Sequence, residues 1–168
     1  MGAPASRRRP PGAAWWLALL FVLWDSGERI NAVMGLTWDR VDLRNGWIRF
    51  AAEDRKGATA DTASRIAAET IAALRAIKRP RGEVFHWPYS QTYLFRRLGE
   101  IMQRAGLPNS RLYKFHAIRK SVASYYEAAG GNATELLGHS SRRITKAYLD
   151  VRIVGKASPI DILFRPGE

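Results

Sequence analysis

The sequence predicts a mainly α-helical α+β fold with one small three-stranded antiparallel sheet. Asn45-Gly46 is a strong hairpin signal, and it separates two short strand-like runs, Val41–Leu43 and Trp47–Phe50. Apolar stripes with a helical period occupy most of the remaining chain. At 168 residues and 46% hydrophobic composition, the chain fits one domain with a proper core. We therefore expect strands only around this hairpin.

The region before the hairpin predicts two helices. An apolar run from Ala13 to Trp24 predicts a buried helix over 13–25, and this run is too short to span a bilayer. Ser26-Gly27 ends that helix, and a second short helix should run from about Glu28 to Gly35. We expect no membrane association.

Residues on either side of this region complete the first half. Residues 1–12 contain three arginines and several prolines and predict a basic flexible tail, so we expect the folded domain to occupy 13–168. The polar stretch 53–63 predicts a loop, and a third short strand should lie near Arg65–Ala67. The sheet is therefore expected to contain a hairpin and one further strand.

Helices dominate the prediction for the second half. Helical periodicity predicts a helix over Glu69–Lys78, and Ser90 is placed to cap another that ends at about Ala105. A further helix is expected over Lys114–Ala129. Asn132 followed by Glu135 resembles a capping box, with Asn in place of Ser or Thr, and predicts a short helix that reaches Leu137.

The charge balance points to a polyanionic partner. The chain has 27 basic and 15 acidic residues, a formal charge of +12 and a pI near 10.7, which favours nucleic acid as that partner. There is no cysteine, which excludes disulfides, thiolate metal sites and a cysteine nucleophile. The lack of cysteine also fits a reducing interior, and we expect a cytoplasmic, nucleoid-associated protein.

A set of polar residues in a fixed order suggests phosphodiester chemistry. Arginine stays charged and grips two phosphate oxygens at once, lysine and histidine can move protons, and a tyrosine can attack phosphorus. The sequence shows no convincing acidic cluster to hold catalytic metals, so side chains must supply the positive charge. The candidates are Arg29, Lys56, His116, Arg119, His139 and Tyr148.

Two compact runs carry most of this signal: FHAIRKS at 115–121 and LLGHSSRRITKAYLD at 136–150. Their wording and the order of the six candidates resemble the catalytic domain of the tyrosine recombinases, the phage integrase family. The resemblance covers roughly residues 13–150. It departs from the family in a longer loop around Lys56 and a shorter interval from Arg119 to His139, where Gly130-Gly131 marks a trimmed turn.

The resemblance implies a mechanism. In this family a tyrosine attacks a DNA phosphate, forms a 3′-phosphotyrosyl link and frees a 5′ hydroxyl, so neither a nucleotide cofactor nor a metal is needed. It implies that Tyr148 is the nucleophile and that Arg29 and Arg119 hold the non-bridging oxygens. It also implies that Lys56 is the general acid, that His116 assists proton transfer and that His139 orients the phosphate.

The expected partner is double-stranded DNA. Further contacts to DNA are expected from Arg55, Arg96, Arg97, Arg104, Arg142 and Arg143, although a solvated face is the alternative for Arg96, Arg97 and Arg104. Family members carry a separate N-terminal domain that closes around DNA, for which this chain has no room before Ala13. We expect a homo-oligomer, a tetramer, on DNA and a monomer when free, with weak and strongly salt-dependent binding.

Two alternatives to a site-specific recombinase stay open. A type IB topoisomerase-like relaxase shares the tyrosine and the basic residues, and relaxation of supercoils by a monomer would favour it. A DNA-binding regulator derived from a recombinase is the non-catalytic alternative. Loss of one or more catalytic residues would mark such a regulator, whereas all six are present here.

Overall fold

The computed structural model describes residues 11–55, 60–110 and 114–155. It shows a mainly helical fold with one three-stranded antiparallel sheet, which confirms the predicted fold class. The predicted tail lies almost entirely outside the described residues. The helices and strands are α1 (Ala13–Ser26), α2 (Ile30–Met34), β1 (Val41–Asp42), β2 (Trp47–Phe50), β3 (Thr62–Arg65), α3 (Ala68–Ala76), α4 (Gln91–Arg104), α5 (Phe115–Ala128), α6 (Ala133–Leu136), α7 (Arg142–Lys146) and α8 (Val151–Val154). Short 3₁₀ turns at Trp38–Arg40 and Ala52–Asp54 flank the hairpin.

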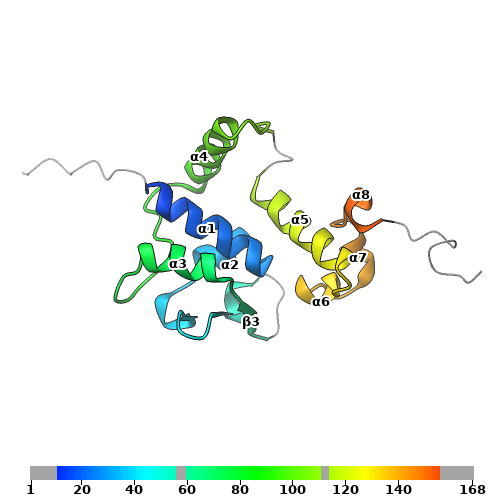
Figure 1. The fold of residues 1–168 in the computed structure, drawn as a ribbon, viewed down its shortest axis with the longest axis horizontal. Helices are drawn as coiled ribbons and strands as arrows, with labels where there is room; N and C mark the ends of the chain where they lie inside the picture. The colour runs from blue at the N-terminus through cyan, green and yellow to red at the C-terminus, as the bar shows by residue number, and fades with distance from the viewer. Residues whose placement is uncertain (1–10, 56–59, 111–113, 156–168) are drawn as a thin grey trace, which may run out of the picture.

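Helix α1 is the centre of the main core. Its side chains pack against α2, α3, α4 and the inner face of the sheet in one apolar cluster, and α3 lies alongside it (Figure 1). Gly27 ends the helix with a left-handed φ of 62°, and its N–H donates to the carbonyl of Leu23 (3.0 Å). The apolar run that could be mistaken for a membrane segment is therefore a core helix. No helix in the described ranges combines the length and apolarity that crossing a bilayer requires.

The sheet follows the predicted hairpin. Its strand order is β1-β2-β3, with Ile48 and Phe50 of β2 in the core and Trp47 and Arg49 on the outer face. The third strand begins at Thr62 and ends at Arg65, so it lies two to three residues before the expected position near 65–67. The reason lies in the next two residues: Ile66 turns into the core, and the N–H of Ala67 donates to a carboxylate oxygen of Asp25 (2.8 Å). The chain thus leaves the sheet early to begin α3.

Helix caps predicted from the sequence are present. Ser90 accepts a hydrogen bond from the N–H of Tyr93 at the start of α4 (3.2 Å). Asn132 accepts from the N–H groups of Thr134 (3.1 Å) and Glu135 (3.4 Å) at the start of α6. These caps satisfy backbone donors that a helix terminus leaves unpaired.

A second, smaller apolar cluster lies at the far end of α5. Its buried members are Ala123, Ala133 and Leu137, with Tyr148 and Leu149 packed against them. Figure 1 shows α6, α7 and α8 gathered at this end of α5, apart from α1, α3 and the sheet. Helices α7 and α8 were not predicted, because four or five residues are too few to show a period.

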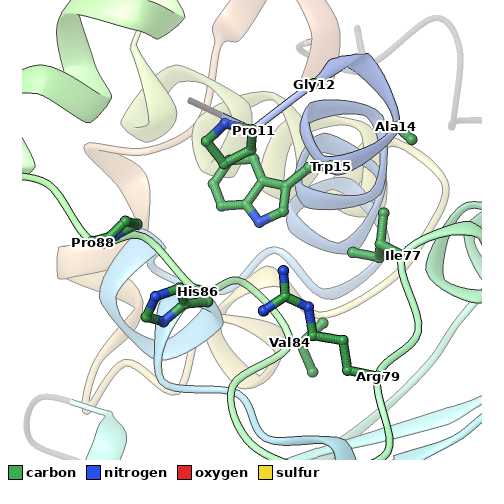
Figure 2. Close-up of a pocket in the computed structure, with 9 residues that line it drawn as sticks. All are labelled: Pro11, Gly12, Ala14, Trp15, Ile77, Arg79, Val84, His86 and Pro88. Carbon is green, nitrogen blue, oxygen red and sulfur yellow. The ribbon is translucent and has the colours of Figure 1, made fainter. Parts of the chain in front are cut away.

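A hollow of about 720 Å³ opens beside the first turn of α1. Trp15, Arg79 and His86 point toward it from three segments (Figure 2). None of the candidate site residues lines this hollow. The candidate chemistry must therefore be sought elsewhere, near α5.

Candidate active site

Arg119 is the buried centre of the site. Only 2% of it is exposed, and its guanidinium joins two distant segments. Nη1 donates to the carbonyl of Gly27 (2.5 Å), and Nη2 donates to the carbonyl of Leu137 (2.8 Å). Within the described residues its Nε has no hydrogen-bond partner. Arg119 thus has one fixed edge and one unused donor.

Two helix ends supply those carbonyls because each ends in a left-handed glycine. Gly138, with φ of 60°, closes α6. Its backbone N–H donates to the carbonyl of Glu135 (2.9 Å), and the backbone N–H of His139 donates to the carbonyl of Thr134 (3.0 Å). This Schellman pairing leaves the Leu137 carbonyl free for Arg119. A Cβ at Gly27 would stand 3.1 Å from the Val122 side chain, so both conformation and space favour glycine there.

His139 follows this turn and points back toward the tyrosine. Its Nδ1 lies 3.1 Å from the hydroxyl of Thr145, which is fully buried. Its Nε2 is buried without a hydrogen-bond partner in the described part of the chain. A threonine that donates to Nδ1 would place the ring proton on Nε2, where it is available to an anion. No motif or spacing in the sequence indicated this role for Thr145.

Tyr148 lies between the two histidine rings. Its ring centroid is 4.7 Å from that of His139 and 5.0 Å from that of His116. The segment is anchored to α5, because the N–H of Asp150 donates to the hydroxyl of Ser124 (2.8 Å). Together with the contacts of Leu149 in the small cluster, this fixes the tyrosine beside both imidazoles.

Arg29 completes the positive surroundings. It is the N-cap residue of α2 and is half-buried. Its charge lies close enough to the site to lower the pKa values of His116, Arg119 and His139. No salt bridge to its guanidinium occurs among the described residues, so the group is available to a ligand.

Burial and, after it, neighbouring positive charges lower the pKa values of three residues of the site. Burial and then the Arg29 charge lower the pKa of Arg119 to about 10. Burial is also the main cause of the lowered pKa of His116 and of His139, and neighbouring cations add to it. An anion in this position would reverse the repulsive contribution to all three pKa values. The electrostatics therefore suit a phosphate.

Glu28 is the important residue that sequence reasoning missed. It is 3% exposed, its Oε1 accepts from Nε of Arg55 (2.7 Å), and its Oε2 lies 3.7 Å from Nη1 of Arg119. The expected DNA contact at Arg55 assumed an exposed loop position, but only 6% of Arg55 is exposed. The ion pair with Glu28 holds this side chain in the interior, where it has little exposed surface for a DNA contact.

The other expected DNA contacts lie on α4 and α7. Arg96 stacks on the ring of Tyr93 at 4.7 Å, and the half-buried Arg97 pairs with Glu100. Arg142 pairs with Glu127. Arg104 and Arg143 are exposed, and Lys56 lies outside the described residues.

The structure thus brings together Arg29, His116, Arg119, His139 and Tyr148, which the chain separates by up to 119 positions. The described residues hold no group of three or more His, Asp or Glu side chains arranged for a metal. What the arrangement offers is two imidazoles, two guanidiniums and a phenol around one space. Such a set can neutralise a phosphate and present a nucleophile to it.

Comparison with known proteins gives this arrangement a family. The model of the phage integrase family matches residues 4–153. The chain therefore belongs to the phage integrase family, whose members include the tyrosine recombinases.

Relatives and solved structures agree with this assignment. Tyrosine recombinase XerC of Xanthomonas campestris pv. campestris (strain B100) is 30% identical over 146 residues, which are 78% of this chain and 42% of that protein. The XerA recombinase structure superposes with a TM-score of 0.67 at 18% identity, covering 88% of this chain and 61% of that one. A XerH recombinase bound to its palindromic difH substrate superposes with a TM-score of 0.63 at 21% identity, covering 83% of this chain and 44% of that one. The chain thus spans less than half the length of the XerC relative.

Proposed function

We propose that this domain cleaves and rejoins DNA as the catalytic domain of a site-specific recombinase, through a 3′-phosphotyrosyl intermediate. The observation that carries the proposal is the position of Tyr148 between His116 and His139 (centroids at 5.0 and 4.7 Å), beside a buried arginine. Arg119 Nε and His139 Nε2 are buried nitrogens without partners in the described residues, and the histidine nitrogen is a donor in the tautomer in which Thr145 donates to Nδ1. Buried polar groups are rarely left unpaired, so these two atoms suit a ligand that accepts hydrogen bonds.

The proposed cleavage step uses these residues together with Lys56, which lies outside the described residues. The Tyr148 oxygen forms a bond to phosphorus as the bond to the 5′ oxygen breaks, and the DNA 3′ phosphate becomes esterified to the tyrosine. His116 takes the phenol proton, and Lys56 gives a proton to the leaving 5′ oxygen. Arg29, Arg119 and His139 stabilise the charge on the non-bridging oxygens, as in an oxyanion site. Rejoining is the reverse, with a 5′ hydroxyl as the attacking group.

Double-stranded DNA is the proposed partner, and a tetramer is the proposed assembly on it. The formal charge of +12 supports a polyanion, and the XerH relative was crystallised with its DNA substrate. Arg96, Arg97, Arg104, Arg142 and Arg143 are the proposed phosphate contacts beyond the site. A supercoiled plasmid tests the topoisomerase alternative, since a recombinase should not relax it as a monomer.

A nicked suicide duplex tests the proposal, because cleavage near the nick releases a short strand and traps the covalent adduct. Wild type should give an adduct on a denaturing gel. Tyr148→Phe removes only the nucleophilic oxygen and should give none, with folding and DNA binding near wild type. Tyr125→Phe is the matched control, since Tyr125 also belongs to this region but is 55% exposed on α5.

Two results would contradict the proposal. An adduct from Tyr148→Phe would mean that another tyrosine is the nucleophile. DNA binding by wild type with no adduct on any candidate site would favour the regulator alternative.

Binding by this chain should be weak and governed by phosphate contacts. Phosphates position a protein, whereas base edges specify sequence. We expect a Kd of roughly 10⁻⁴–10⁻⁶ M at physiological salt, a steep loss of affinity as salt rises and little difference among duplexes. Fluorescence anisotropy across a salt series measures this. Nanomolar, sequence-selective binding would show that the chain recognises its target alone.

A further inference from the structure

A buried ion pair lies next to Arg119. Glu28 and Arg55 have side chains 3% and 5% exposed, 27 positions apart in sequence. Their contact is the 2.7 Å hydrogen bond from Arg55 Nε to Glu28 Oε1. Neither residue takes part in the proposed cleavage step.

The Glu28 carboxylate connects three basic residues. While Oε1 holds Arg55, Oε2 accepts a hydrogen bond from the backbone N–H of Arg29 (3.3 Å) and lies 3.7 Å from Nη1 of Arg119. The backbone N–H of Glu28 donates to the hydroxyl of Ser26 (3.2 Å), which ties Glu28 to the last residue of α1. The same carboxylate therefore contacts both arginines that would bind the phosphate.

Arg55 reaches a different set of neighbours. Nη1 donates to the carbonyl of Ala60 (3.5 Å). Nη2 lies 3.2 Å from the point where a Cβ on Gly138 would stand, so the guanidinium packs against the turn that precedes His139. Arg55 thus contacts both Glu28 and the turn at the end of α6 that leads into His139.

Energetic considerations indicate that the Glu28–Arg55 pair positions neighbouring groups more than it stabilises the fold. Taking two charges out of water costs several kcal/mol, and apolar replacements of a buried ion pair are often neutral or stabilising. Here two guanidiniums share one carboxylate, which leaves a net positive charge inside the protein. The pair supplies position instead: Glu28 lies against the edge of Arg119 that the Gly27 and Leu137 carbonyls hold, and Arg55 supports the turn that carries His139.

We propose that Arg55 and Glu28 are positioning residues for DNA cleavage. They hold Arg119 and the Gly138–His139 turn so that Arg119 Nε and His139 Nε2 face the same phosphate. This inference rests on the proposed function and assigns Arg55 a role other than a DNA contact. Neither residue touches the reacting atoms.

The test measures the single-turnover rate of adduct formation on the nicked suicide duplex, at saturating DNA, together with DNA affinity. Arg55→Gln and Glu28→Gln should each slow cleavage by about 10²-fold, because misplacing a catalytic group by about 1 Å costs that much. The Kd for DNA should stay within about twofold of wild type. Glu28→Asp and Arg55→Lys, which keep the charges, should recover part of the rate.

Asp54→Asn is the matched control. Asp54 precedes Arg55 and accepts a hydrogen bond from Arg40 Nη1 (2.5 Å) on the outer side of the same turn. This variant loosens the segment without touching Glu28, and its cleavage rate should stay near wild type. Circular dichroism establishes which variants are folded.

The double variant Glu28→Gln/Arg55→Gln separates a shared role from two independent ones. The double variant should cleave no more slowly than the slower single variant, because both changes remove the same contact. Losses that multiply would overturn the inference, as would single variants that cleave like Asp54→Asn; in both cases the proposed function stands. Absence of an adduct from wild type would overturn the function and this inference with it.

Discussion

The two halves of the active site are held in different ways. Glu28 and Arg29 connect α1 to α2, two helices that pack in the large core, whereas Tyr148 packs against the small cluster of Ala123, Ala133 and Leu137, and His139 follows the turn after Leu137. Arg119 bonds to both halves, through Gly27 on one side and Leu137 on the other. The half that holds Arg29, a proposed phosphate ligand, thus rests on extensive apolar packing, while the half that holds Tyr148, the proposed nucleophile, depends on a few specific contacts.

Helix length explains the difference. Helix α1 has 14 residues and a continuous buried face, whereas α6, α7 and α8 have four or five residues each. Isolated helices that short are unstable, so hydrogen bonds must fix them. Asn132 caps α6, Gly138 closes it, and Ser124 holds the backbone of Asp150. Segments with little buried apolar surface open more readily than a packed core, so α6, α7 and α8 should open before α1.

Removing Arg119 should break the connection between the halves and produce the largest effect. Arg119→Met deletes both bridging hydrogen bonds and leaves the Gly27 and Leu137 carbonyls unpaired. We expect cleavage to fall by at least about 10²–10³-fold. The free energy of unfolding should fall by about 3–5 kcal/mol, since one partner of a buried charged network is lost. Suicide-substrate assays and urea unfolding measure the two effects.

Arg142→Met is the control for that experiment. Its guanidinium pairs with Glu127, but the side chain is 55% exposed, so stability should change by no more than about 1 kcal/mol. Equal destabilisation by Arg119→Met and Arg142→Met would show that Arg119 does not join the two halves.

Truncating one leucine in each cluster should separate their roles. Leu74 in the large core and Leu137 in the small cluster are both 0% exposed, and either change to Ala should cost about 2–5 kcal/mol of local packing. Leu137→Ala should expose the amides of α6–α8 to hydrogen exchange and slow cleavage while α1 stays protected. Leu74→Ala should lower global stability and spare cleavage in the folded fraction. Identical exchange patterns would contradict the division into two halves.

Local signals in the sequence predicted the elements with clear caps and periods. Ser90 and Asn132 have short-range partners, and Asn45-Gly46 specifies its own turn, so neighbouring residues were enough to predict them. The order of the candidate residues predicted that six of them gather around one space; five are found together, and the sixth, Lys56, lies outside the described residues. The burial of Glu28 and Arg55 could not be predicted, because their contact joins positions 27 apart and a charged pair has no period. Thr145 was missed because its role depends on a turn that only the folded chain forms.

Titration of the two histidines should give the smallest effect and compare the halves directly. Burial and neighbouring cations lower the pKa of both: His116 faces Lys120, Arg119 and Arg29, and His139 faces Arg119 and Arg29. Between each lowered pKa and the unfolded value of about 6.5, the unfolded chain binds more protons. Stability from these groups is therefore full above pH 6.5, falls as the pH drops through that interval, and levels off below the folded pKa.

NMR titration of the ring protons, assigned with His116→Gln and His139→Gln, should show both pKa values below 6.5. Inorganic phosphate at constant ionic strength should raise both, because the anion offsets the charges of Arg29 and Arg119. A rise for His116 alone would place the anion away from the α6 turn, and no rise for either would mean that the five residues do not form an anion site.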